Sequence, residues 1–368
     1  MQRNALTVLL ALVCIALVAA AQYRLLDSYL LTVLMFMGIN IVFATSLNLV
    51  NGYMGEFSCG HGGFMCVGAY VGSILSVALF SGNKLMGPAL LSPALAPLLF
   101  PLVLLAAFAV SALCGLLVAL PSFRTRDDYL AIITIAANYI IISVVENIDA
   151  IGGPRGFSGM KRTVLAMEDV VDIPWMLVWV IVVTIVCVII QRRLMSSTYG
   201  RGICAVCQNE VAAEIMGVDT NRVKLMAFML SSGLAGVAGV LYAHVYGYVN
   251  AQAFNILKST EGLVMVYLGG MGSLSGVILA AIAFTLLVEG LRFAIPALND
   301  LLHAVQLMPA SYEISQVWKW VLLPLLLVLL MQFRPEGFLG NKELTDVFPR
   351  LKRWMRSGSG EADGRGAS

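Results

Sequence analysis

Long apolar segments separated by short polar ones dominate the hydrophobicity pattern of this chain. A membrane-spanning helix needs about 20 mostly apolar residues, so a chain of 368 residues has room for about ten of them. The segments that we predict to span the membrane are 5–21, 30–50, 52–80, 98–120, 129–147, 175–190, 225–248, 253–268, 277–291 and 318–333. The pattern predicts an all-α, polytopic integral membrane protein. Segment 5–21 ends in three alanines and also fits a cleaved signal peptide, but further spans follow directly, which favours a retained span.

Two of these segments are interrupted by glycines and predict broken or re-entrant helices. Residues 52–72 contain seven glycines, too many for a regular helix interior. The short segment 253–268 leads into GGMGSLSG at 269–276, and short, glycine-interrupted apolar segments are typical of discontinuous helices along a transport path. Because the two glycine-rich stretches resemble each other, we hypothesise that two half-domains each contribute a broken segment to one pathway.

Small residues at helical spacing predict close helix contacts elsewhere in the chain. Gly68 and Gly72 form a GxxxG pattern, and Gly233, Gly236 and Gly239 follow one another at intervals of three residues. Such stripes let helix backbones approach one another in a membrane. We interpret both sets as packing surfaces.

Polar side chains at membrane depth, together with the glycines of the broken segments, form the candidate translocation path. Such side chains usually face a neighbouring helix or a wet cavity rather than lipid. The candidate residues are Asn48, Ser58, Gly60, His61, Asn138, Gly269, Gly270 and Gly272. For His61 we favour a structural role, the capping of loop carbonyls. Lys258 and Glu261 lie three residues apart and are expected to pair locally.

A polar island at 200–224 stands between two long apolar segments. Its sequence predicts a single amphipathic helix from 203 onward, with Ile203, Val206, Val211, Ile215 and Met216 near one face. A glycine at 217 fits the helix end. A short helix between two spans suits a mechanical contact with a soluble partner, and a solvated loop helix without function is the competing interpretation.

The distribution of basic residues predicts the orientation in the membrane. With ten spans and both termini in the cytoplasm, 15 of the 23 Lys and Arg residues fall on the cytoplasmic side and 8 on the other. This bias has the sign of the positive-inside rule and places the polar island in the cytoplasm. Beyond the last span, residues 341–368 form a cytoplasmic tail that we expect to be partly disordered.

Composition and motifs exclude several functions. The chain is 60% apolar and 12% charged, with a mean hydropathy of +0.88, which leaves no room for a soluble catalytic domain. The near balance of 23 basic and 21 acidic residues argues against a nucleic-acid surface. There is no phosphate-binding loop motif, and the three histidines are scattered. Cys204 and Cys207 form a lone CxxC, for which reduced thiols are favoured over zinc or redox chemistry. We expect no catalytic or metal site.

Several ordered motifs resemble those of one transporter family. Glu210-Val-Ala-Ala followed by Gly217 resembles the "EAA"-type coupling loop of ABC importer permeases. The run QNEVAAEIMGVDTNRVKLMAFMLSSGLAGVAGVLYAH is similar to the permease of branched-chain amino acid importers, the LivM-type subunit. Three further stretches agree: NGYMGEFSCGHGGFMCVGAY at 51–70, YLGGMGSLSGVILAA at 267–281 and FRPEGFLG at 333–340. The resemblance covers residues from about 40 to 340.

This resemblance implies a transport subunit in a bacterial-type inner membrane, with residues 1–340 as the transmembrane permease domain. The implied partners are two cytoplasmic ATPase subunits that use ATP, a second homologous permease and an extracytoplasmic substrate-binding protein. The implied contacts with the ATPase are Arg201, Gln208, Asn209, Glu210, Ala212, Ala213, Glu214 and Gly217. The implied substrates are branched-chain amino acids. A urea or short-amide importer is the alternative. An ion-coupled secondary transporter would be expected to carry charges inside its spans, and a membrane-embedded enzyme would need a catalytic constellation that is not visible here.

Overall fold

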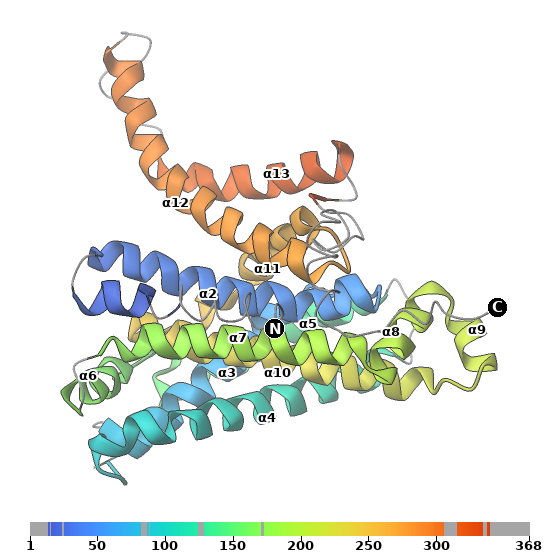
Figure 1. Ribbon diagram of the computed structural model, residues 1–368, viewed down its shortest axis with the longest axis horizontal. Coiled ribbons are helices and arrows are strands. Elements are labelled where there is room, and N and C mark those ends of the chain that lie inside the picture. The colour runs from blue at the N-terminus through green and yellow to red at the C-terminus, as the bar shows by residue number, and fades with distance from the viewer. Residues whose placement is uncertain are drawn as a thin grey trace, which may run out of the picture.

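The computed structural model describes residues 14, 16–23, 26–81, 87, 89–123, 129–170, 173–304, 315–333 and 337–338. The long helices are α2 (Ser28–Asn48), α3 (His61–Ser76), α4 (Ala96–Ser122), α5 (Tyr129–Glu146), α7 (Trp175–Ser196), α10 (Thr220–Tyr246), α11 (Ile256–Gly269), α12 (Leu274–Ala304) and α13 (Lys319–Phe333). Most of the long helices run side by side in one bundle, from which part of α12 and α13 stand out (Figure 1). The prediction of an all-α membrane fold is confirmed.

Short elements extend or connect these helices. The π-helical turns η1 (Leu49–Tyr53) and η2 (Val77–Ser81) continue α2 and α3. The short helices are α6 (Met160–Val170), α8 (Thr198–Gln208) and α9 (Glu210–Ile215), and the 3-10 turns are η3 (Pro93–Leu95), η4 (Asp149–Ile151), η5 (Gly153–Arg155), η6 (Ala251–Phe254) and η7 (Gln316–Trp318). Strands β1 (Phe157–Ser158) and β2 (Tyr248–Val249) form a two-residue antiparallel ribbon.

Seven helices in the described part of the chain are long and apolar enough to cross a membrane. They are Ser28–Tyr53, His61–Ser81, Ala96–Ser122, Tyr129–Glu146, Trp175–Ser196, Thr220–Tyr246 and Leu274–Asp300. Of the other three predicted spans, 253–268 and 318–333 correspond to α11 and α13, which have only 14 and 15 residues. The predicted span 5–21 lies largely outside the described residues.

The centre of the bundle is α10, which packs against α2, α3 and α4. Its small residues allow this, as predicted: a methyl group at Gly68 of α3 would overlap the backbone of Gly236. Similarly, Gly239 lies against the carbonyl oxygen of Met65, and Gly115 of α4 lies against Ser232. Apolar side chains gain little by leaving lipid for a helix interface, so helices in a membrane are held together by close van der Waals contact of this kind.

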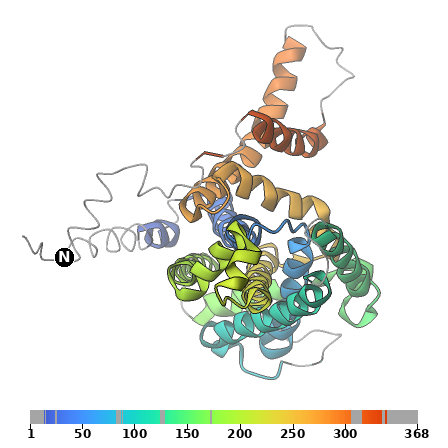
Figure 2. The same ribbon diagram turned by 90° about the vertical axis from the view of Figure 1, so that its right-hand side faces the viewer.

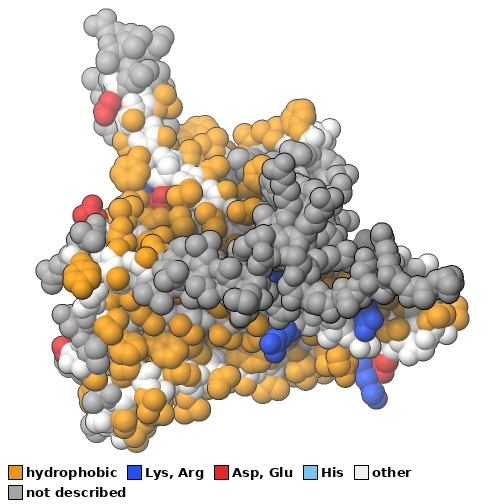
Figure 3. All heavy atoms as spheres, in the orientation of Figure 1, with side chains coloured by type: hydrophobic (Ala, Val, Ile, Leu, Met, Phe, Trp, Pro, Cys, Tyr) orange, Lys and Arg blue, Asp and Glu red, His pale blue; other side chains and the backbone are white. Residues whose placement is uncertain are grey.

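The two ends of the bundle carry different elements. The α8 and α9 helices lie at one end, while α6 lies at the opposite end (Figure 1). The far part of α12 extends away from the bundle, and α13 returns beside α11 (Figures 1 and 2). Where the described residues are visible between the two ends, most of their side chains are hydrophobic, and Lys and Arg side chains appear toward the α8–α9 end (Figure 3).

Three sequence-based expectations about element bounds were wrong. The predicted single helix from 203 onward is two helices, because Asn209 leaves the helical conformation (φ −163°). The connection between the predicted spans 129–147 and 175–190, for which no helix was predicted, contains α6, an 11-residue helix. The span predicted to end at 291 continues as α12 to Ala304.

Candidate functional site

The α8–α9 unit (residues 198–215) is built by two side-chain caps. Ser197 accepts a hydrogen bond from the backbone amide of Gly200 at 3.3 Å, which begins α8 one residue after α7 ends. The carboxamide oxygen of Asn209 accepts from the amide of Ala212 at 2.9 Å and begins α9. At the other end of α9, Gly217 adopts a left-handed backbone (φ +84°) that favours glycine. The unit therefore has a defined start, corner and end.

The apolar residues of this unit divide into two groups. Ile203 and Val206 of α8 are buried, whereas Val211, Ile215 and Met216 are 66%, 80% and 83% exposed. The prediction that all five share one face is therefore wrong, since the break at Asn209 turns α9 away from the bundle. Of the predicted coupling residues, Ala213 is buried and Glu210 is half-buried. The others, Arg201, Gln208, Asn209, Ala212, Glu214 and Gly217, are exposed.

A lysine at the start of α10 joins α9 to the first broken segment. Lys224 Nζ lies 2.9 Å from Glu210 Oε2 and 2.8 Å from Glu56 Oε1. Only 9% of the Lys224 side chain and 11% of the Glu56 side chain are exposed, against 42% for Glu210. The Phe123 ring covers the ammonium group, 5.9 Å from its centroid. We refer to Glu56, Lys224 and Glu210 as the ion triad.

A second contact, between α8 and the first broken segment, lies beside the ion triad. Gly55 has a left-handed backbone (φ +75°), and Cys207 Sγ lies 2.7 Å from the position that a methyl group on it would occupy. Burial, followed by the nearby charge of Glu56, raises the pKa of the Cys207 thiol. Cys204 and Cys207 are both free thiols, so no disulfide joins the CxxC pair.

The two glycine-rich breaks meet inside the bundle. The irregular segment 54–60 separates η1 from α3, and residues 270–273 separate α11 from α12, with positive φ at Gly270 and Gly272. The Gly272 amide donates a hydrogen bond to Asn48 Oδ1 at 3.1 Å, and a methyl group at Gly52 would overlap this contact. The two stretches that resemble each other in sequence are therefore neighbours, as the half-domain hypothesis requires.

A buried hydrogen-bonded chain runs from the first break to α10. His61 Nδ1 lies 3.1 Å from Ser58 Oγ, and its Nε2 lies 2.7 Å from Ser231 Oγ. Ser231 in turn donates to the carbonyl of Ser46. The expectation that His61 caps loop carbonyls was wrong, because both ring nitrogens face serine hydroxyls. Its ring therefore lies between Ser58 of the first break and Ser231 of α10.

The remaining candidates of the path surround the start of α3. Thr134 accepts a hydrogen bond from the Cys59 amide at 3.2 Å, and Gly60 packs against the Thr134 carbonyl. Asn138 lies against Gly63, and neither atom of its buried carboxamide has a partner among the described residues. Farther along, Gly269 packs against Gly276. The structure thus places these candidates in two groups, one around the start of α3 and one around the Asn48–Gly272 contact.

The Lys224–Glu56 pair, Ser231 and Ser259 were missed by sequence reasoning. Ser259 accepts a hydrogen bond from the Gly62 amide at 2.9 Å and so ties α11 to the start of α3. Lys224 had a sequence signal, because it is a charge at the edge of an apolar segment, where a partner is expected. The serines had none, because small polar residues are common inside helix bundles.

Broken helices that meet inside a bundle, beside a polar unit at one end, define a multi-pass membrane protein of the transport-permease class. The chain belongs to the family described as "Branched-chain amino acid transport system / permease component", which matches residues 29–331.

Individual relatives agree with this family. The chain is 30% identical to the high-affinity branched-chain amino acid transport system permease protein LivM of Salmonella typhimurium, over 89% of this chain and 72% of the relative. It is also 30% identical to LivM of Escherichia coli, over 82% and 68% of the two chains. Identity to the probable LivM of Methanocaldococcus jannaschii is 25%, over 89% and 98%. No solved structure matches the chain with significance.

Proposed function

We propose that this chain is the membrane permease subunit of an ATP-driven importer that moves branched-chain amino acids into the cell by alternating access. The observation that carries the proposal is the link from the exposed α9 through the ion triad to the first broken segment. Family membership supplies the transport class and the substrate class.

The proposed partners follow from the surface of the α8–α9 unit. Val211, Ile215 and Met216 expose an apolar patch on a polar loop, as expected of a protein-binding surface. We assign this patch to a cytoplasmic ATPase subunit, one of a pair that binds and hydrolyses ATP, while this chain binds none. A second homologous permease and an extracytoplasmic binding protein complete the complex, and both termini of this chain lie in the cytoplasm.

The proposed coupling runs through side chains that are in contact. Closure of the ATPase pair moves α9, and Glu210 moves with it. Because Lys224 binds both Glu210 and Glu56, this displacement acts on the start of α10 and on residues 54–60 together. The latter segment leads directly to the Gly52–Gly272 contact between the two breaks. The substrate passes where these breaks separate.

The test compares variants of the co-expressed complex. Glu210→Ala removes the carboxylate that binds Lys224, and Gly217→Pro requires a φ near −65° where the backbone has +84°. Both variants should insert normally, lose co-purifying ATPase and lose ATP-driven leucine uptake in proteoliposomes. Asp169→Asn on α6, at the opposite end, is the matched control and should behave as wild type. Normal uptake by both α9 variants, or uptake by this chain alone without ATP, would refute the proposal.

A further inference from the structure

A cavity of about 600 Å³ lies between α2, α10, α11 and α12. Its wall includes Gln252 of η6 and the ends of α10 and α11 farthest from the α8–α9 unit. It therefore opens in the half of the bundle that, in the proposed orientation, faces the binding protein. Its volume is within the range of small-molecule sites.

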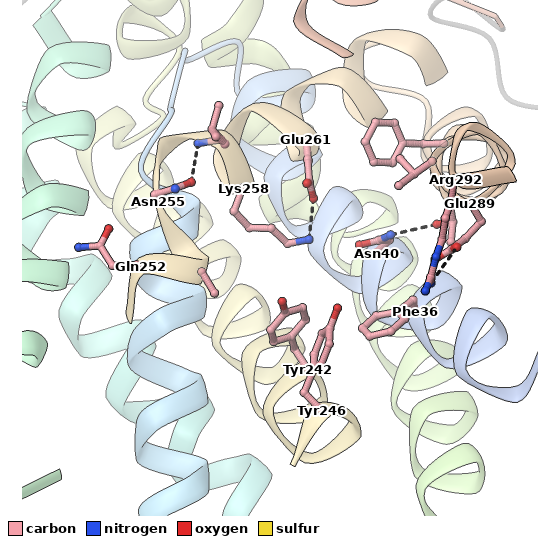
Figure 4. A pocket seen from close by; sticks show the side chains of 15 residues that line it. Phe36, Asn40, Tyr242, Tyr246, Gln252, Asn255, Lys258, Glu261, Glu289 and Arg292 are labelled. Atoms are coloured by element: carbon pink, nitrogen blue, oxygen red, sulfur yellow. Dashed lines mark hydrogen bonds and ion pairs between the residues drawn. The ribbon is translucent and has the colours of Figure 1, made fainter. Parts of the chain in front are cut away.

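The charges in the cavity wall come as two opposed pairs. Lys258 Nζ lies 2.6 Å from Glu261 Oε2 on α11, and Arg292 Nη1 lies 3.7 Å from Glu289 Oε2 on α12. Figure 4 shows one pair on each side, with Asn40 of α2 between them. Two positive and two negative groups leave the wall neutral overall but locally polar.

Local pairing alone does not account for these charges. A pair three residues apart on a helix contributes only about 0.2–0.5 kcal/mol, and burying its charges costs more than that. The Lys258 and Glu261 side chains are only 13% and 15% exposed. Charged side chains within apolar helices usually mark a substrate pathway. A ligand with charges of its own would offset the cost of burying them.

Aromatic rings give the cavity an apolar side. The ring centroids of Tyr242 and Tyr246 lie 4.7 Å apart with the rings tilted at 52°, and the Phe36 ring centroid lies 5.0 Å from that of Tyr246. The Lys258 ammonium lies 5.5 Å above the Tyr242 ring, which leaves it beside the apolar surface. Phe284 of α12 adds to this surface. Charged groups next to aromatic rings fit a molecule with a charged head and an aliphatic tail.

Two helices, α2 and α11, lead from this cavity to the two breaks. From Lys258 to Gly269, α11 covers eleven residues, about 16 Å at 1.5 Å per residue. From Asn40 to Asn48, α2 covers eight residues, about 12 Å. Asn40 also donates a hydrogen bond to Thr285 of α12 at 2.9 Å. A ligand in the cavity would therefore lie about 12 Å from the Asn48–Gly272 contact, on the side away from the α8–α9 unit.

We propose that this cavity is the outer binding site for one zwitterionic, aliphatic amino acid. Lys258, which has three N–H donors and gives one to Glu261, binds the carboxylate of the ligand. Glu289, whose Oε2 accepts from Tyr29, binds the ammonium group from the facing helix. The aliphatic chain packs against Phe36 and Phe284. The assignment rests on the proposed function, since that function supplies the class of substrate.

The test measures binding of radiolabelled leucine to the full complex in nanodiscs, without the binding protein. Two competitors each lack one charge: 4-methylpentanoate has no ammonium group, and 3-methylbutylamine has no carboxylate. We expect wild type to prefer leucine to either by about tenfold or more, the effect of one charge-assisted hydrogen bond. In Lys258→Met the preference over 3-methylbutylamine should vanish, and in Glu289→Gln the preference over 4-methylpentanoate should vanish.

Two further variants keep the test decisive. Lys258→Met with Glu261→Gln removes both charges, so no unpaired carboxylate remains, and should show the same change in preference. Arg162→Met, an exposed charge on α6, should bind leucine as wild type does. Unchanged preference in the Lys258 variants, or no leucine binding by wild type, would overturn this site. Absence of ATP-driven leucine uptake by the wild-type complex with its binding protein would instead overturn the proposed function.

Discussion

Replacing Lys224 by methionine should reveal how much the ion triad contributes to holding α9 against the bundle. Methionine keeps most of the volume of the side chain but removes the ammonium group. Glu56, only 11% exposed, would then be a buried carboxylate without its partner. Loss of one partner from a buried ion pair costs about 3–5 kcal/mol. Glu210 is 42% exposed, so its share is that of a surface pair, about 0.2–1 kcal/mol.

These magnitudes predict an order among variants. Lys224→Met should destabilise the protein most, Glu56→Gln less, because glutamine needs no counter-charge, and Glu210→Gln least. The double variant Glu56→Gln with Lys224→Met should recover much of the loss, since it leaves no unpaired charge.

Thermal unfolding of the purified chain in mild detergent, followed for all four variants, checks this order. Binding of the ATPase subunit, measured on the same preparations, separates loss of stability from loss of docking. Additive losses in the double variant, or equal losses in the three single variants, would refute the assignment of Lys224 as a shared, buried partner of both carboxylates.

Three further perturbations follow from the packing. Gly68→Val should prevent α3 from approaching α10 at Gly236 and lower the unfolding temperature, with an overpacking cost of about 1–3 kcal/mol or more. Gly52→Ala should separate the two breaks, so leucine uptake falls while co-purification of the ATPase persists. The raised pKa of Cys207 means that less thiolate exists at pH 8 than for an ordinary thiol, so alkylation in a Cys204→Ser background should be slow and accelerate only at higher pH. Glu56→Gln removes one cause of that shift and should speed alkylation at pH 8, and an unchanged or slower rate would contradict the placement of this carboxylate.

The broken helices were predictable from the sequence because glycine has a local conformational role. The GGMGSLSG run contains the break at 270–273. The glycine-rich stretch 52–72 was predicted to be broken throughout, but its break covers only 54–60, and four of its seven glycines lie inside α3. The glycine stripes of α3 and α10 were predictable for the same reason, since helical spacing alone brings small residues onto one side.

The corner between α8 and α9 was missed although its signal was present. Asn209 is a preferred helix-start residue and is followed by an acidic residue in the first turn, which marks a new helix as well as it marks an exposed polar face. The apolar periodicity continues across this start signal, so the sequence predicts Val211 and Ile215 on the same face as Val206.

The ion triad and the hydrogen-bond partners of His61 were not predictable from the sequence, because they depend on contacts between segments that are distant in the chain. Glu56 lies in the first broken segment, but its partner Lys224 lies at the start of a helix far along the chain. His61 similarly meets Ser231 only because α3 and α10 pack through their glycines. Local pairs were different: Lys258 and Glu261, three residues apart, pair as predicted.

The short connection between α7 and α8 links the position of α9 to the surrounding membrane. In the described bundle α10 is enclosed by its neighbours, with 72% of its apolar window buried, whereas the figure for α7 is 33%. Bilayer thickness acts on the tilt of membrane-spanning helices, and less of α7 than of α10 is held by neighbouring helices in the described bundle. Only Ser197 separates α7 from α8, so a tilt of α7 changes how far α9 protrudes from the membrane surface. In the proposed complex, membrane thickness would then affect how closely the ATPase subunit approaches α9.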